Sequence, residues 1–86
     1  MNYIIGDIGN TSTRICLLTD SKISKSIVFN TKKIFSRGFV KGIIKKFLKK
    51  DLRKDILFSC VVPKALKNIK KILKKINYNV FEIKRF

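Results

Sequence analysis

The segment from Ile56 to Val62 constrains the fold more than any other part of the sequence, because it is almost entirely apolar, with Ser59 as its polar interruption. A short apolar run of this kind, ended by Pro63, is typical of a central strand that is covered on both faces of a parallel sheet. Neighbouring parallel strands must be joined by long crossover connections, which are usually helices. The run therefore predicts an open α/β sheet.

The segments on both sides of this run have the spacing of amphipathic helices. In each of them apolar residues recur every three or four positions, and lysines fill the positions between. Ser36 can serve as the N-cap of the first helix, and Pro63 suits the first turn of the second. These patterns predict helices over residues 36–50 and 63–76, followed by a short strand over residues 80–84.

The first third of the chain contains three strand-like segments separated by turn residues. They cover residues 3–8, 13–19 and 23–29, and Gly or Asn is expected to supply a positive φ in the first turn. The order β-β-β-α-β-α-β is that of a ribonuclease H-like half-domain, with a mixed five-stranded sheet of order 3-2-1-4-5 and two helices. Right-handed crossovers favour this layout, and an open α/β sheet of another order is the alternative.

Length and charge limit the number of domains and the choice of partners. A chain of 86 residues supplies one domain with one modest core. The net charge of +16 is compatible with nucleic acid or an anionic membrane surface as a partner. The excess is mostly lysine, which drift of the gene towards A and T rich codons also explains. A basic nucleic-acid-binding module is therefore kept as an alternative function, and membrane attachment through residues 36–50 is a third hypothesis.

Other features of the composition bear on location and metal binding. No apolar run approaches the roughly 18 residues that cross a bilayer, and the first residues lack a basic leader, so we expect a cytoplasmic protein without a membrane partner. Cys16 and Cys60 do not have the spacing of a zinc site, and we expect both to be reduced.

An aspartate at the end of the first strand precedes a turn rich in glycine and hydroxyl side chains. Asp7 can hold Mg²⁺, the amides of residues 9–12 can form an anion-binding concavity, and the hydroxyls at positions 11–13 can add donors. Gly9 would let a phosphate approach the backbone closely. An ordinary hairpin turn with local hydrogen bonds is the alternative. The carboxylate on an apolar strand favours the phosphate site, because an unused ionisable group there costs stability.

Two motifs connect the sequence to a known family. The segment Asp7-Ile8-Gly9-Asn10-Thr11-Ser12-Thr13 resembles the first phosphate motif of type III pantothenate kinases, members of the actin-like superfamily of kinases and ATPases. The segment Ser59-Cys60-Val61-Val62-Pro63 is similar to the Ser-Ser-Val-Val-Pro segment of the same family, with Cys60 in place of the second serine. The resemblance spans essentially the whole chain.

The resemblance implies an ATP-dependent kinase that phosphorylates pantothenate in the first step of coenzyme A biosynthesis. Asp7 would then organise Mg²⁺ and the ATP phosphates, while Gly9, Asn10, Thr11 and Ser12 would line the phosphate turn. In full-length members the resemblance also implies a monovalent cation, K⁺ or NH₄⁺, and a homodimer.

The sequence departs from the family in its length. Members are much longer, and their second half brings a Gly-x-Asp-Arg segment with the catalytic aspartate, the second phosphate motif and the pantothenate pocket. We therefore expect residues 1–86 to form a single N-terminal phosphate-binding subdomain, with the second kinase domain absent and no catalytic residue in this chain. Such a chain is expected to be inactive alone.

Overall fold

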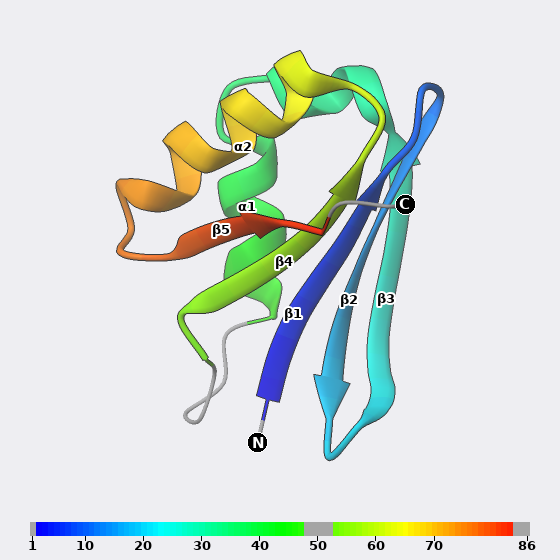
Figure 1. The fold of residues 1–86 in the computed structure, drawn as a ribbon, viewed down its shortest axis with the longest axis vertical. Coiled ribbons are helices and arrows are strands. Elements are labelled where there is room, and N and C mark those ends of the chain that lie inside the picture. The colour runs from blue at the N-terminus through cyan, green and yellow to red at the C-terminus, as the bar shows by residue number, and fades with distance from the viewer. Residues whose placement is uncertain (1, 48–52, 84–86) are drawn as a thin grey trace.

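The computed structural model describes residues 2–47 and 53–83, which form a five-stranded sheet with helices packed on one face (Figure 1). The elements are β1 (Asn2–Ile8), β2 (Ser12–Thr19), β3 (Lys22–Asn30), the 3-10 helix η1 (Thr31–Phe35), α1 (Phe39–Lys46), β4 (Asp55–Cys60), α2 (Pro63–Lys74) and β5 (Asn79–Glu82). The spatial order is β3-β2-β1-β4-β5. The first three strands are antiparallel, and β4 and β5 continue the sheet in parallel with β1. The predicted ribonuclease H-like order is confirmed.

The first helix begins later than the sequence pattern predicts. Chain segment 31–35 forms η1, whose N-cap Asn30 accepts a hydrogen bond from the Lys32 amide through its side chain. The helix α1 starts at Phe39, after Gly38 adopts a left-handed φ of 77° at the N-cap, so the predicted cap at Ser36 is wrong. Residues 48–50 of the predicted helix and residue 84 of the predicted last strand lie outside the described residues.

The two hairpin turns differ in backbone conformation. In the turn between β2 and β3, Asp20 and Ser21 have φ values of 51° and 67°, a pair of left-handed residues that suits a tight hairpin turn. In the turn between β1 and β2, neither Gly9 nor Asn10 has a positive φ. The prediction of a positive φ in this first turn is therefore wrong, and the glycine there has another cause, described with the site.

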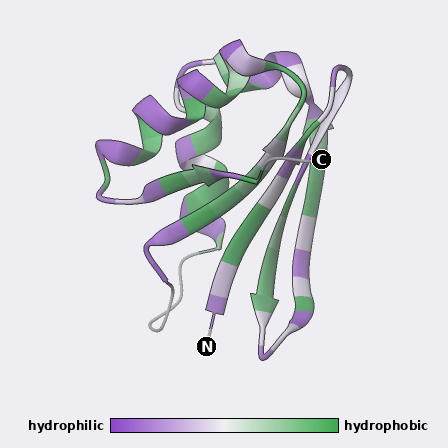
Figure 2. Cartoon of the chain, viewed as in Figure 1, coloured by the Kyte–Doolittle hydropathy of each residue, from purple (hydrophilic) through white to green (hydrophobic). Residues whose placement is uncertain are grey.

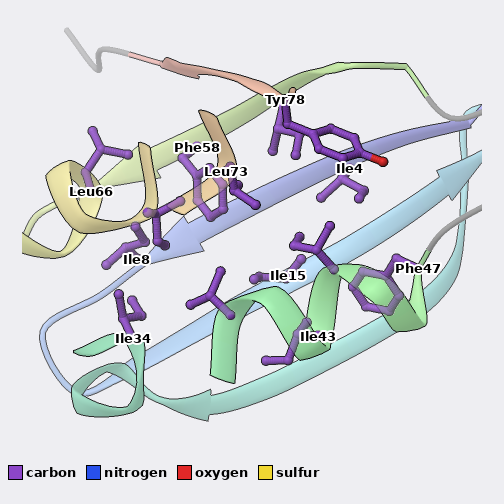
Figure 3. Close-up of a cluster of buried hydrophobic side chains, with 14 of the residues drawn as sticks. Ile4, Ile8, Ile15, Ile34, Ile43, Phe47, Phe58, Leu66, Leu73 and Tyr78 are labelled. Carbon is purple, nitrogen blue, oxygen red and sulfur yellow. The ribbon is translucent and has the colours of Figure 1, made fainter. Parts of the chain in front are cut away.

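The core lies between one face of the sheet and the two helices (Figure 3). Strand alternation sends Ile4 and Ile8 of β1 to this face, where both side chains are fully buried. The helices contribute residues at helical spacing, such as Ile43 and Ile44 from α1 and Leu73 from α2. Burying this apolar surface is the main favourable contribution to folding.

Lysines cover the outer side of the helical layer. The helix α2 buries Leu66 and Ile69 and exposes Lys67, Lys70 and Lys74. Figure 2 shows the resulting alternation of hydrophobic and hydrophilic residues along α2. No helix among residues 2–47 and 53–83 is both long enough and apolar enough to cross a membrane.

One face of the sheet remains without a helical layer in the described part of the chain. On β4 the side chains of Ile56 and Phe58 are fully buried beneath the helices, whereas Leu57, which points to the other side, is 42% exposed. The prediction that this strand is covered on both faces is therefore wrong for the chain as described. Within the described residues, the apolar side chains of β4 are buried on one side of the sheet only.

A glycine on β1 makes room for the aromatic ring at the centre of the core. Gly6 lies opposite Phe58 in the parallel register of β1 and β4. A Cβ atom on Gly6 would lie 2.1 Å from the Phe58 ring, far inside van der Waals contact. Phe58 is fully buried, so its ring has little freedom to move aside.

This packing predicts opposite effects for two glycine substitutions. Gly6→Ala should destabilise the protein by about 1–3 kcal/mol, because the added methyl overpacks the core. Gly42→Ala should stabilise it by about 0.5–1 kcal/mol, because that helical glycine has nothing within 4 Å of its Cβ position. Urea unfolding followed by circular dichroism measures both, and a Gly6→Ala variant as stable as the wild type would contradict the packing argument.

Candidate functional site

The two sequence motifs meet at the carboxyl ends of β1 and β4. Asp7 lies near the end of β1, on the face of the sheet opposite the helices, and is exposed. It is in register with Ser59 on β4, and the Ser59 hydroxyl donates a hydrogen bond to Asp7 Oδ1 across 52 residues of sequence. Ligand sites in open α/β sheets are found at such strand ends.

The remainder of the second motif forms a tight connection into α2. The Val61 amide donates to the Ile8 carbonyl over 3.0 Å, which extends the pairing of the two motifs by one bond. Cys60 Sγ lies 3.0 Å from the Val62 carbonyl and 3.2 Å from the Val62 amide, and these contacts close the turn. Pro63 then begins the helix, as its fixed φ predicts.

The glycine of the first motif is required by close backbone packing. The Gly9 amide donates to the Ser12 carbonyl over 2.9 Å, and a Cβ on Gly9 would also lie 2.9 Å from that oxygen. The close approach of the Ser12 carbonyl oxygen therefore explains why a residue without a Cβ atom occupies position 9. The Gly9 amide is occupied within the turn, so it cannot be one of the anion-binding donors predicted from residues 9–12. The side chains of Asn10, Thr11 and Ser12 are all exposed.

Thr31, the first residue of η1, holds the turn between β1 and β2 in place through hydrogen bonds. Its hydroxyl donates to the Gly9 carbonyl over 2.7 Å, and its amide donates to the Thr11 carbonyl over 2.9 Å. The Thr31 and Thr13 hydroxyls are 2.9 Å apart, and both residues are buried. Thr13, predicted as a phosphate donor, instead belongs to this internal support.

Arg14 and Thr31 belong to this region but were not predicted from the sequence. Arg14 is exposed and lies opposite Asp7 in the register of β1 and β2, so both residues occupy the same face of the sheet. Strand alternation identifies Arg14 once the register is known, because positions paired across strands share a face. No local sequence pattern identifies Thr31, because it follows the last residue of β3 and comes next to the turn between β1 and β2 only in the folded chain.

An exposed carboxylate followed by exposed hydroxyl side chains is compatible in chemistry with the binding of Mg²⁺ and phosphate. Mg²⁺ is commonly bound by one or two carboxylates together with water and substrate phosphate oxygens. Among the described residues no three side chains of His, Cys, Asp or Glu gather in one place. Asp7 therefore suits a metal that takes most of its ligands from solvent and phosphate, and the exposed side chains of Thr11 and Ser12 lie on the turn that follows.

The sheet order β3-β2-β1-β4-β5, with two helices on one face, defines a domain of the ribonuclease H-like fold class. The solved structure of the PPX-GPPA enzyme of Aquifex aeolicus has a TM-score of 0.52 to this chain at 17% identity, and the alignment covers 96% of this chain and 36% of that one. This likeness concerns the fold alone.

Sequence comparison identifies the family within this class. A profile of type III pantothenate kinase matches residues 3–85. A type III pantothenate kinase of Pelagibacter ubique (strain HTCC1062) is 39% identical over 74 residues, which make up 85% of this chain and 30% of the relative. The chain belongs to the type III pantothenate kinase family. It spans about a third of the length of this relative.

The support of the turn by Thr31 can be tested with two substitutions. Thr31→Val keeps the shape of the side chain but leaves the buried Thr13 hydroxyl without this partner, so it should cost about 1–3 kcal/mol of unfolding free energy. Thr31→Ser keeps the hydroxyl and should lose markedly less. Thermal unfolding measures both, and a Thr31→Val variant as stable as the wild type would show that the Thr31 hydroxyl does not support the turn.

Proposed function

We propose that this chain supplies the ATP phosphate-binding part of a pantothenate kinase, which transfers a phosphoryl group from ATP to pantothenate. The observation that carries the proposal is the hydrogen bond between Ser59 and Asp7, which unites the two family motifs at one edge of the sheet. The exposure of Asp7 on the open face leaves its carboxylate within reach of solvent ions.

In this proposal each residue of the site has a defined role. Asp7 holds Mg²⁺ directly or through water, and Ser59 orients its carboxylate. Gly9, Asn10, Thr11 and Ser12 line the phosphate turn, with the exposed side chains as hydrogen-bond donors. Arg14, on the same face as Asp7, adds positive charge near the phosphates. Positioning and charge stabilisation of this kind make up most of what phosphoryl transfer requires of a protein.

The other parts of the reaction are assigned to the remainder of a family-length kinase. The catalytic aspartate, the pantothenate pocket, the K⁺ or NH₄⁺ site and the homodimer interface belong there in our proposal, and we name no catalytic residue among residues 1–86. The chain alone is therefore expected to bind nucleotide weakly and not to phosphorylate pantothenate. The cytoplasmic location expected from the sequence stays a prediction.

Binding of ATP tests the role of Asp7 directly. Isothermal titration of the 86-residue chain with ATP should show weak binding that requires Mg²⁺, and Asp7→Asn should weaken it at least about tenfold because the metal loses its charged ligand. Asp20→Asn is the matched control, since Asp20 is an exposed aspartate in the other hairpin turn. Equal binding by the wild type and Asp7→Asn would remove Asp7 from the site.

Nucleic-acid binding remains the second candidate because of the lysines on the helical layer. Lys64, Lys67 and Lys71 surround a hollow with the exposed ring of Phe35, which places an aromatic side chain among cations. Such a surface would bind single strands through stacking and charge. If the function of the chain is to bind ATP phosphates as part of a kinase, a mobility-shift assay with single-stranded RNA should show no binding at about 150 mM salt. Salt-sensitive binding that Phe35→Ala abolishes would instead support the alternative.

A further inference from the structure

The helical layer, formed by η1, α1 and α2, carries charge of one sign. Residues 31–47 and 63–75 contain no Asp or Glu, and their basic side chains are all exposed: Lys32, Lys33, Arg37, Lys41, Lys45, Lys46, Lys64, Lys67, Lys70, Lys71, Lys74 and Lys75. Every acidic residue that the structure describes lies instead on a strand of the sheet or in a hairpin turn: Asp7, Asp20, Asp55 and Glu82. Positive charge is therefore segregated onto the helical side of the molecule.

Repulsion within α2 makes this arrangement unfavourable in the chain by itself. Residues three or four apart on a helix are neighbours on its surface, and like charges at that spacing destabilise the helix. Lys64, Lys67 and Lys71 have this spacing and form one line along α2, which we call the basic stripe. Figure 2 shows hydrophilic bands that recur along this helix. A partner with negative charge along the same line would relieve the repulsion.

A hollow beside the basic stripe adds an apolar contact to the charge. It lies between η1 and α2, has a volume of about 240 Å³, and is lined by the basic stripe, Asn68 and Phe35. Phe35, the last residue of η1, is 54% exposed. The Asn68 side-chain amide donates to the Ile34 carbonyl over 3.0 Å, which ties α2 to η1 at the hollow. An aromatic ring among cations suits a partner that combines carboxylates with one apolar side chain.

We propose that the basic stripe and this hollow bind an acidic α-helix of another protein, with one apolar side chain of that helix against Phe35. A helix rises about 1.5 Å per residue, so Lys64 and Lys71 are about 10 Å apart along its axis. Glutamates that recur every three or four residues on a partner helix have the same rise and can face the ammonium groups in turn. Glu82 lines a neighbouring hollow with Lys67 and Lys70, which limits the partner to the side of α2 next to η1.

Two other anionic partners fit this surface less well. A membrane-binding helix needs an apolar face that is free to enter the lipid, but α1 and α2 bury theirs in the core through residues such as Ile43 and Leu73. Arginine is the side chain that pairs with phosphate through two parallel hydrogen bonds. Arg37 is the one arginine in residues 31–47 and 63–75, and it does not line the hollow, which disfavours nucleic acid.

Binding of two designed peptides to the 86-residue chain tests the proposal. Both are labelled, helix-forming peptides of the same composition with several glutamates and one phenylalanine. In the first the glutamates form one line beside the phenylalanine, and in the second they are spread around the helix. Fluorescence anisotropy at about 50 mM salt should show at least about tenfold tighter binding of the first peptide, because it alone aligns its charges with the basic stripe. Equal affinities would overturn the proposal.

Substitutions in the chain separate the basic stripe from the net charge. Lys67→Glu should weaken binding of the first peptide at least about tenfold. Lys22→Glu, the same change at an exposed lysine at the start of β3, is the matched control and should weaken it less than about threefold. Both side chains are exposed, so both variants should keep the fold, which circular dichroism checks. Equal losses in the two variants would overturn the proposal.

A second pair of variants tests the apolar contact. Phe35→Ala should weaken binding of the first peptide about fivefold, whereas Phe81→Ala, at a phenylalanine of similar exposure on the sheet, should leave it unchanged. Tighter binding of a single-stranded RNA of the same net charge than of the first peptide would overturn the proposal and make nucleic acid the occupant. The assay contains no nucleotide, so its result is independent of the titration with ATP.

Discussion

The parallel pairing of β1 with β4 is the interaction on which the rest of the structure depends. Its register sets Gly6 beside Phe58 on the helical face and Asp7 beside Ser59 on the open face. A slip by one residue would turn Phe58 out of the core and separate the aspartate from its serine. A close packing contact and a hydrogen bond therefore enforce the same register from opposite sides of the sheet. The core and the site are consequences of one strand alignment.

The order of strands and helices could be predicted because it follows from local patterns of apolar residues. The three strand-like segments of the first third, the run at residues 56–62 and the helical spacing around it together gave the element order from which the 3-2-1-4-5 sheet was predicted. Details set by tertiary contacts were not predictable. Gly9 is explained by the carbonyl of Ser12 and not by its own φ, and Thr13 is withdrawn from the site by Thr31, which lies 18 residues away. The motif residues locate the site, but their individual tasks depend on neighbours that only the fold brings together.

The two faces of the sheet have different surroundings and different chemistry. The helical face is closed by a core that includes Ile4, Ile8 and Phe58, while lysines cover the outside of that layer. The open face combines the exposed Asp7 with apolar side chains that solvent still reaches. The candidate site and this apolar surface are therefore neighbours on one face.

The hydrogen bonds of Thr31 have a consequence for the thermodynamics of binding. They hold the carbonyls of Gly9 and Thr11 while the side chains of the turn still face solvent. A turn that is already ordered loses little conformational entropy when an anion arrives, so more of the contact energy is retained as affinity. The two bonds from Thr31 engage carbonyl oxygens of the turn, so this restraint occupies none of the turn's own hydrogen-bond donors.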